Sequence, residues 1–126
     1  MTTGGSPARE AFAHDALLRM DPDGDDRAPG GAVTLALCGS VAHEPPCRLA
    51  PHHTRAERTG AELSLRVLFA ARPADEVSVR RLIDWALETG WGDDPGGVRT
   101  TWRLIRSGPS PLRDDELAHA QRLARN

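Results

Sequence analysis

The residue types best suited to chemistry are gathered in one segment of the chain. Residues 38–53 contain both cysteines and three of the five histidines. The candidate ligands there are Cys38, His43, Cys47, His52 and His53. Thiolate and imidazole groups are preferred ligands of Zn²⁺, and they also suit copper and nickel. The segment therefore predicts a transition-metal site, with zinc as the preferred ion, in a stretch irregular enough to fold around it.

Other interpretations of the two cysteines stay open. Cys38 and Cys47 can be a buried thiol and a loop thiol, or they can form a disulfide across the eight residues between them. Cys47 can also act as a nucleophile, with a nearby histidine lowering its thiol pKa. The segment has no C-x-x-C pair, and Pro45 and Pro46 prevent the helix that metalloprotease histidines require.

Arginines in and after the same segment indicate a second kind of site. Arg48, Arg55 and Arg58 outnumber the neighbouring Glu44 and Glu57. Arginine binds phosphate and carboxylate groups through two parallel hydrogen bonds, so a small anionic ligand could bind there. The alternative is a solvated loop of mixed charge.

The remaining candidates favour ordinary structural roles. Residues 21–26 are rich in aspartate, but the twelfth position of a calcium loop, where a glutamate is needed, is Ala32. His14 and His119 are expected on helices, exposed to solvent. Trp102 is expected in the core.

Composition excludes several classes of protein. The chain of 126 residues has a formal net charge of −2, which does not favour a general nucleic-acid binder. Every basic side chain is arginine, which excludes lysine-dependent Schiff-base and P-loop chemistry. No apolar run is long enough to span a membrane, and no signal-peptide pattern is present. We therefore expect a single cytoplasmic domain over residues 1–126, with no membrane partner.

Hydrophobic periodicity predicts three helices and three strands. Helices are expected over residues 7–20, 75–89 and 112–125, and strands over 32–38, 63–70 and 99–106. Residues 1–6 and 21–31 are expected to be flexible, and residues 39–60 to form a long loop that carries the function. The β-α-β unit in the middle of the chain implies that its two strands run parallel.

The order α-β-β-α-β-α predicts an α+β fold, with a small mixed three-stranded sheet and helices mainly on one face, related to a ferredoxin-like sandwich. The expected function is that of a small soluble metal-binding domain with a structural or metal-handling role, and not of an enzyme. The alternative is a non-enzymatic module that binds a ligand, a protein partner or a second copy of itself through the loops 39–60 and 91–97.

Overall fold

Five strands and three α-helices make up the part of the chain that the structure describes. A computed structural model defines the positions of residues 8–39 and 50–125. The main elements are β1 (Glu10–Met20), α1 (Ala28–Cys38), β2 (His52–Thr59), β3 (Glu62–Ala71), α2 (Glu76–Thr89), β4 (Trp91–Asp93), β5 (Arg99–Ser110) and α3 (Leu117–Ala124). Short 3-10 turns, η1 (Pro73–Asp75) and η2 (Asp114–Glu116), precede α2 and α3.

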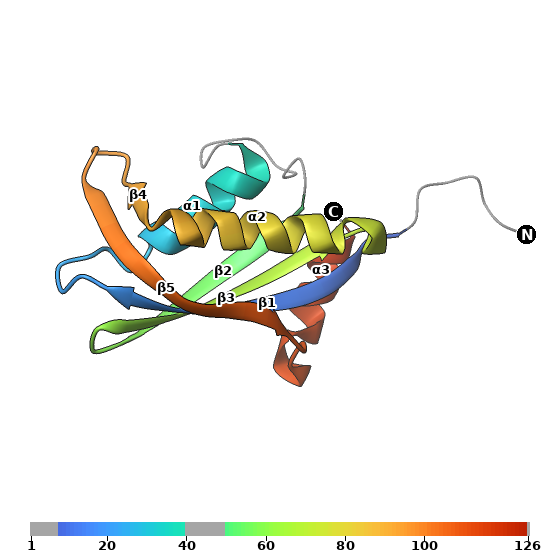
Figure 1. The fold of residues 1–126 in the computed structure, drawn as a ribbon. Coiled ribbons are helices and arrows are strands. Elements are labelled where there is room, and N and C mark those ends of the chain that lie inside the picture. The colour runs from blue at the N-terminus through green and yellow to red at the C-terminus, as the bar shows by residue number, and fades with distance from the viewer. Residues whose placement is uncertain (1–7, 40–49, 126) are drawn as a thin grey trace, which may run out of the picture.

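The strands form one curled sheet in the order β2-β3-β1-β5-β4, and every neighbouring pair is antiparallel. The prediction of a small mixed three-stranded sheet is therefore wrong, although the fold is still α+β. β3 and β5 do run in the same direction, but β1 lies between them and pairs with both. Helices α1 and α2 lie on one face of the sheet, and α3 packs on the other (Figure 1).

The predicted helix over residues 7–20 is wrong, because β1 occupies the middle of the sheet. β1 carries apolar side chains at consecutive positions, because Leu17 lies on the open face between Ala16 and Leu18, which face the main core. Such a run imitates the apolar stripe of a helix. Pairing with β3 and β5 outweighs the intrinsic helix preference of alanine and leucine.

The predicted strand over residues 32–38 is also wrong, because these residues belong to α1. Val33 and Leu37, which the alternation placed on one strand face, are four residues apart and are both buried on one helix face. Pro29 lies in the first turn of α1, where its missing N–H is not needed. The helix has no charged residue, so no polar face marked it as a helix.

Three segments expected to be loops contain regular structure. Residues 28–31 of the segment 21–31 form the start of α1. The segment 39–60 contains the whole of β2, and the segment 91–97 contains β4. β2 is an edge strand with a polar sequence, so it lacked the hydrophobic alternation that predicts a strand.

The other four elements are confirmed. The strands predicted over 63–70 and 99–106 are β3 and β5, and the helix over 75–89 is α2, which ends at Gly90 with a positive φ of 81°. The helix over 112–125 is present as η2 followed by the shorter α3. β5 also continues through Pro109, which is tolerated because β4 pairs only with the first residues of β5 and leaves its outer side unpaired at Pro109.

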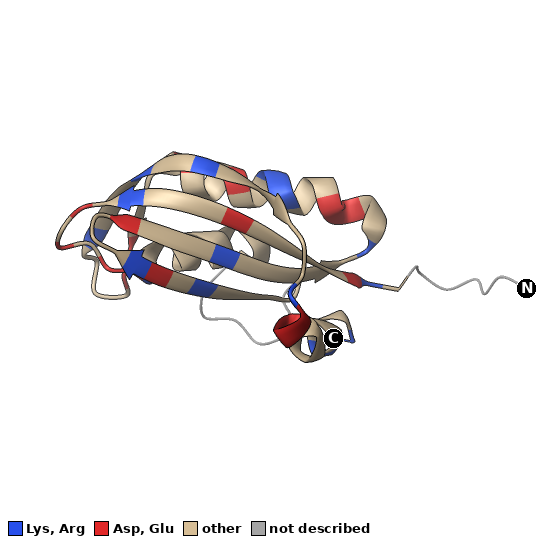
Figure 2. Ribbon diagram, turned by 90° about the horizontal axis from the view of Figure 1, so that it is seen from below, with Lys and Arg blue, Asp and Glu red and all other residues tan. Residues whose placement is uncertain are grey.

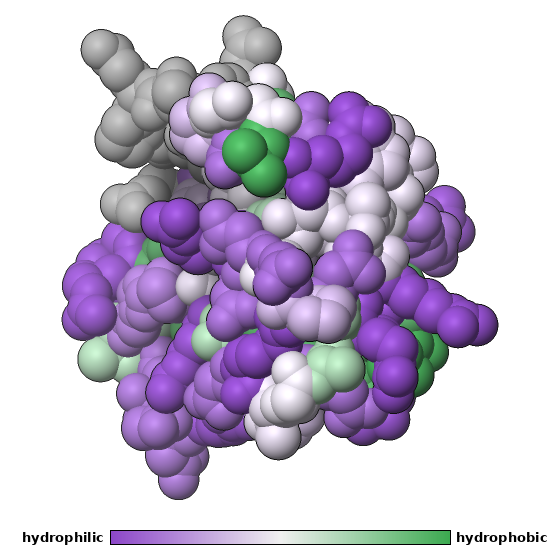
Figure 3. Space-filling model, turned by 90° about the vertical axis from the view of Figure 1, so that its left-hand side faces the viewer, coloured by the Kyte–Doolittle hydropathy of each residue, from purple (hydrophilic) through white to green (hydrophobic). Residues whose placement is uncertain are grey.

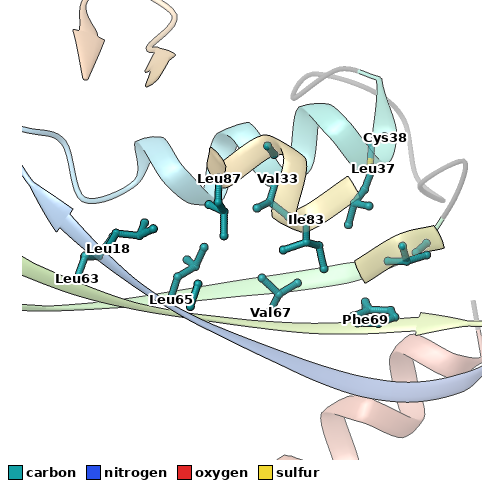
Figure 4. Close-up of a cluster of buried hydrophobic side chains, with 14 of the residues drawn as sticks. Leu18, Val33, Leu37, Cys38, Leu63, Leu65, Val67, Phe69, Ile83 and Leu87 are labelled. Atoms are coloured by element: carbon teal, nitrogen blue, oxygen red, sulfur yellow. The ribbon is translucent and has the colours of Figure 1, made fainter. Parts of the chain in front are cut away.

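The main hydrophobic core lies between the sheet and the helices α1 and α2. Figure 4 shows its large side chains: Leu18 from β1, Val33 and Leu37 from α1, Leu63, Leu65, Val67 and Phe69 from β3, and Ile83 and Leu87 from α2. Trp102 is 7% exposed, as expected, and its Nε1–H donates to the carbonyl of Leu87 at 2.9 Å. Each fully buried aliphatic side chain contributes about 1.5–3 kcal/mol, so this layer provides most of the stabilisation.

A smaller core lies on the opposite face, under α3. It consists of Ala13, Leu68, Ala70 and Leu123. Because α3 is only eight residues long, it covers one end of this face and leaves the rest of it open. The open part carries the candidate site.

Polar side chains dominate one end of the molecule. This end, which includes the β4–β5 hairpin, is mostly hydrophilic, and its hydrophobic spots are separate from one another (Figure 3). In the part of the chain that the structure describes, no helix is long and apolar enough to cross a membrane.

Candidate functional site

The predicted metal ligands divide between the two faces of the sheet. Cys38 Sγ lies 3.7 Å from His52 Nδ1, so these two side chains are together on the face that α1 covers. His53 follows His52 in β2, and successive side chains of a strand point to opposite faces. Accordingly, the ring of His53 contacts the ring of His119 in α3, with 4.7 Å between centroids. His43 and Cys47 lie outside the described residues.

Cys38 is disulfide-bonded. A disulfide sulfur is not a thiolate, and thiolate is the form that binds zinc. Within residues 8–39 and 50–125, no group of three histidine, cysteine, aspartate or glutamate side chains is placed to hold a metal ion. The metal site therefore stays a prediction.

The predicted anion-binding arginines also separate. Arg58 donates to Asp26 Oδ1 at 2.5 Å and to the carbonyl of Asp21 at 2.9 Å, so it fastens the β1–α1 connection to β2. Arg55 faces the opposite side and is mostly exposed, with Glu57 3.5 Å away. Arg48 lies outside the described residues. Of the two described arginines of this prediction, Arg55 alone faces the open part of the sheet.

Strand register arranges the side chains of the open face in four rows, each of which crosses β2, β3, β1 and β5. Row 1 is His53, Leu68, Ala13 and Ser110; row 2 is Arg55, Arg66, Asp15 and Gly108; row 3 is Glu57, Ser64, Leu17 and Arg106; row 4 is Thr59, Glu62, Arg19 and Arg103. Row 1 lies under or beside α3, whereas Arg55 of row 2 and most of rows 3 and 4 face solvent. Figure 2 shows this face, with arginines and carboxylates distributed over the strands.

A bulge in β5 brings Arg106 to this face. Leu18 pairs with Leu104, but Leu17 pairs with Arg106, so Ile105 is an extra residue in β5. The extra residue reverses the alternation of β5 beyond that point. As a result, Trp102 and Leu104 face the main core, whereas Arg106 faces the open side.

Two pairs of arginines lie directly opposite each other on this face. Arg55 faces Arg66 across β2 and β3, and Arg19 faces Arg103 across β1 and β5. Like charges at directly opposite positions destabilise a sheet. In row 2 the repulsion is relieved within the protein, because the carboxylates of Asp15 and Glu116 pair with Arg66. Row 4 has no ion pair of this kind among residues 8–39 and 50–125.

Arg66 is buried and makes five hydrogen bonds. Its guanidinium donates twice to Glu116 at 2.7 Å, once to Asp15 at 2.9 Å, once to Ser110 Oγ at 2.8 Å and once to the carbonyl of Pro111 at 2.8 Å. The bond from Arg66 lowers the pKa of Glu116 to about 2, and the Glu116 carboxylate raises the pKa of Arg66. Arg66 therefore joins η2 to the sheet and has no donor left for a ligand.

A hollow of about 480 Å³ lies over rows 2 and 3. Its lining includes Asp15, Leu17, Arg55, Glu57, Ser64, Arg66, Arg106, Gly108, Ser110 and Arg113. This volume is within the range of small-molecule sites. Among the described residues Arg106 has no hydrogen-bond or ion-pair partner, and Arg113 is exposed at the side of the hollow next to η2. Arg106 is thus available to an anion, with Ser64 as a nearby hydroxyl.

A second polar cluster surrounds His14, on the side of the sheet that α2 covers. His14 is 2% exposed, which corrects the expectation of an exposed helical residue. Its Nε2 lies 3.0 Å from Asp84 Oδ1 and 2.8 Å from Ser107 Oγ. Ser107 also donates to Asp84 Oδ1 at 2.6 Å. Burial is the main cause that lowers the pKa of His14, while the Asp84 carboxylate opposes it.

The three residue types in this cluster are those of a serine-hydrolase triad, but the hydrogen bonds do not allow that chemistry. His14 Nδ1 lies 3.0 Å from Arg80 Nη1, and a guanidinium can only donate. Nδ1 must therefore accept, which assigns the proton of neutral His14 to Nε2. A serine nucleophile needs an unprotonated ring nitrogen as its base. Because Nε2 donates instead, the cluster links β1, α2 and β5 without activating Ser107.

Comparison with known proteins gives no relative. No protein family, no curated protein and no solved structure matches this chain. The site must therefore be argued from its own geometry.

Sequence reasoning missed most of this site. Arg66 is far from Arg106 and Arg113 in the chain, and strand register and the bulge bring them together. One signal was present: Ser64 and Arg66 alternate with apolar residues in the predicted strand 63–70, which places a buried charge on its second face.

Proposed function

We propose that the protein is a non-enzymatic binding module that holds a small anionic ligand in the hollow on the open face of its sheet. The observation that carries the proposal is the position of Arg106. It lies in the lining of a hollow of ligand size, with no partner among residues 8–39 and 50–125. Phosphate and carboxylate groups are the anions that arginine binds through two parallel bonds.

The surrounding residues support the same ligand chemistry. Arg55 is held only by Glu57 at 3.5 Å, and both side chains are about two-thirds exposed. An ion pair of this kind contributes little, so a ligand can compete with Glu57 for Arg55. Ser64 supplies a hydroxyl, and Leu17 supplies apolar surface for the uncharged part of a ligand. The proposal keeps the anionic ligand expected from the sequence but moves it from the loop 39–60 to the sheet.

Thermal unfolding in inorganic phosphate, with sodium chloride at equal ionic strength as the reference, tests the proposal. A ligand at one hundred times its Kd stabilises the folded state by about 2.7 kcal/mol, which raises Tm by several degrees. We expect phosphate to raise Tm and Arg106→Gln to weaken phosphate binding about tenfold. The matched control is Arg81→Gln, an exposed arginine on α2. Equal Tm values in phosphate, citrate and chloride would contradict the proposal.

A further inference from the structure

We infer that the open face takes a linear chain of phosphates, with one end in the hollow and the other at the pair formed by Arg19 and Arg103. This inference rests on the proposed function and specifies its ligand class. It adds a second cationic position, in row 4, that the hollow does not include.

Arg19 and Arg103 repel each other across β1 and β5. They are directly opposite in β1 and β5, both are exposed, and neither has an ion-pair partner among the described residues. Glu62 is opposite Arg19 on the other side, but no ion pair of 4 Å or less forms between them. An anion between the two guanidinium groups would turn this repulsion into two attractive contacts.

The positive charges of rows 3 and 4 lie along one junction of the sheet. In these rows the carboxylates, Glu57 and Glu62, are on β2 and β3, whereas Arg106, Arg19 and Arg103 are on β1 and β5. A cationic path therefore follows the junction of β1 and β5. Row 3 and row 4 are about 7 Å apart, since each residue of a strand adds about 3.3 Å. Successive phosphates of a linear chain can therefore contact Arg106 and the Arg19–Arg103 pair at the same time.

A phosphate chain without bases suits this face better than a nucleic acid. Proteins that bind single-stranded nucleic acid stack the bases on exposed aromatic rings. Rows 2 to 4 contain no aromatic residue. Trp91, at the start of β4, is exposed, but Arg99 already lies over its ring at 3.8 Å and is paired with Asp93 at 2.8 Å. The face therefore offers cations along its length and no platform for bases.

Calorimetric titration with inorganic phosphate, tripolyphosphate and a longer linear polyphosphate, at constant ionic strength, tests the inference. We expect the Kd to fall at least about tenfold from phosphate to the longest chain, because more arginines are engaged. Arg103→Gln should bring the affinity for the long chain close to that for phosphate. Arg106→Gln should weaken all three ligands, and the control Arg81→Gln should change none. Circular dichroism verifies that each variant is folded.

The outcomes separate this inference from the proposed function. If phosphate binds but Arg103→Gln binds the long chain as tightly as the unaltered protein, the inference is overturned and the hollow remains. If none of the three ligands binds, the proposed function is overturned as well. If oligothymidylate of matched charge binds more tightly than polyphosphate, the ligand class is wrong and the face binds single-stranded nucleic acid instead.

Discussion

Replacing Glu116 with glutamine tests how α3 is held against the sheet. Both carboxylate oxygens of Glu116 accept bonds of 2.7 Å from Arg66, and the Glu116 side chain is 15% exposed. These bonds lower the pKa of Glu116 from 4.5 to about 2. A carboxyl with a depressed pKa stabilises the folded state above its unfolded pKa, and this contribution is lost as pH falls through the folded pKa. The window of loss therefore extends from about pH 5 to about pH 2.

The size of the effect follows from the same pKa values. A tenfold difference in proton affinity corresponds to about 1.4 kcal/mol, so the drop from 4.5 to about 2 sets an upper limit of about 3.4 kcal/mol. Solvent reaches part of the pair, and glutamine can still accept one bond from Arg66. We therefore expect Glu116→Gln to lower the free energy of unfolding by about 2 kcal/mol near neutral pH.

Urea unfolding followed by tryptophan fluorescence measures this difference. The loss should be full at about pH 7 and should fall to about a quarter of that value at about pH 2.5, because protonation has by then removed most of the contribution of the Glu116 carboxylate. Glu88→Gln is the matched control, because Glu88 is exposed on α2, on the other side of the sheet. A loss of the same size at both pH values would refute the ion-pair argument and would leave only a packing effect.

Three further perturbations have definite expected outcomes. Gly30→Ala should lower the free energy of unfolding by about 1–3 kcal/mol, because a Cβ at Gly30 would lie 2.8 Å from Thr54 Oγ1. Gly31→Ala, where nothing lies within 4 Å, should be neutral or stabilising, and equal effects of the two changes would contradict the close approach of α1 to β2. The lowered pKa of His14 makes the folded protein lose stability as pH falls below 6.5, so His14→Gln should make the free energy of unfolding less dependent on pH between about pH 7 and 5. An unchanged pH dependence in the variant would show that other groups cause this loss of stability. The metal-binding hypothesis predicts that zinc raises Tm only after reduction, since Cys38 is disulfide-bonded; a rise in the oxidised protein would show that cysteine is not a ligand.

Elements whose hydrophobic pattern has one clear period could be predicted from the sequence. α2 has buried residues at Val79, Ile83, Ala86 and Leu87 and a charged outer face, and it ends at Gly90. β3 alternates in sequence from Leu63 to Arg66, although the structure buries both of its faces from Leu65 onward. In both elements the sequence pattern has a single period, so a local window is sufficient.

The failures occurred where the hydrophobic pattern did not have the period of the actual element. β1 carries apolar residues on both faces, with Ala13 and Leu17 on the outer one, and α1 has no charged residue. In β2 the opposite holds, since an edge strand can be polar throughout. Contacts with distant parts of the chain determine which of these segments is a helix and which is a strand. Local propensity contributes little free energy compared with these contacts.

The candidate site was harder still to predict. Arg55 was singled out for its neighbours in sequence, yet in space it lies opposite Arg66 and lines the same hollow as Ser64 and Arg106. Their proximity depends on strand register, and a shift of one residue would send each of these side chains to the other face. The predicted ligands His52 and His53 were separated for the same reason, because adjacent residues of a strand cannot face the same side.

Because β5 contains an extra residue, the number of residues in this strand matters more than the residue type at position 105 for which side chains reach the open face. Ile105 separates two stretches that alternate in opposite phase, one that ends with Trp102 and Leu104 in the core and one that begins with Arg106 outside it. Any side chain at position 105 that tolerates exposure would preserve both phases, since Ile105 is already 45% exposed. Removal of the residue would preserve neither, because Arg106 would then take an inward position or the core residues an outward one. In an alignment of future relatives, a gap at position 105 would therefore signal loss of this face more strongly than any substitution there.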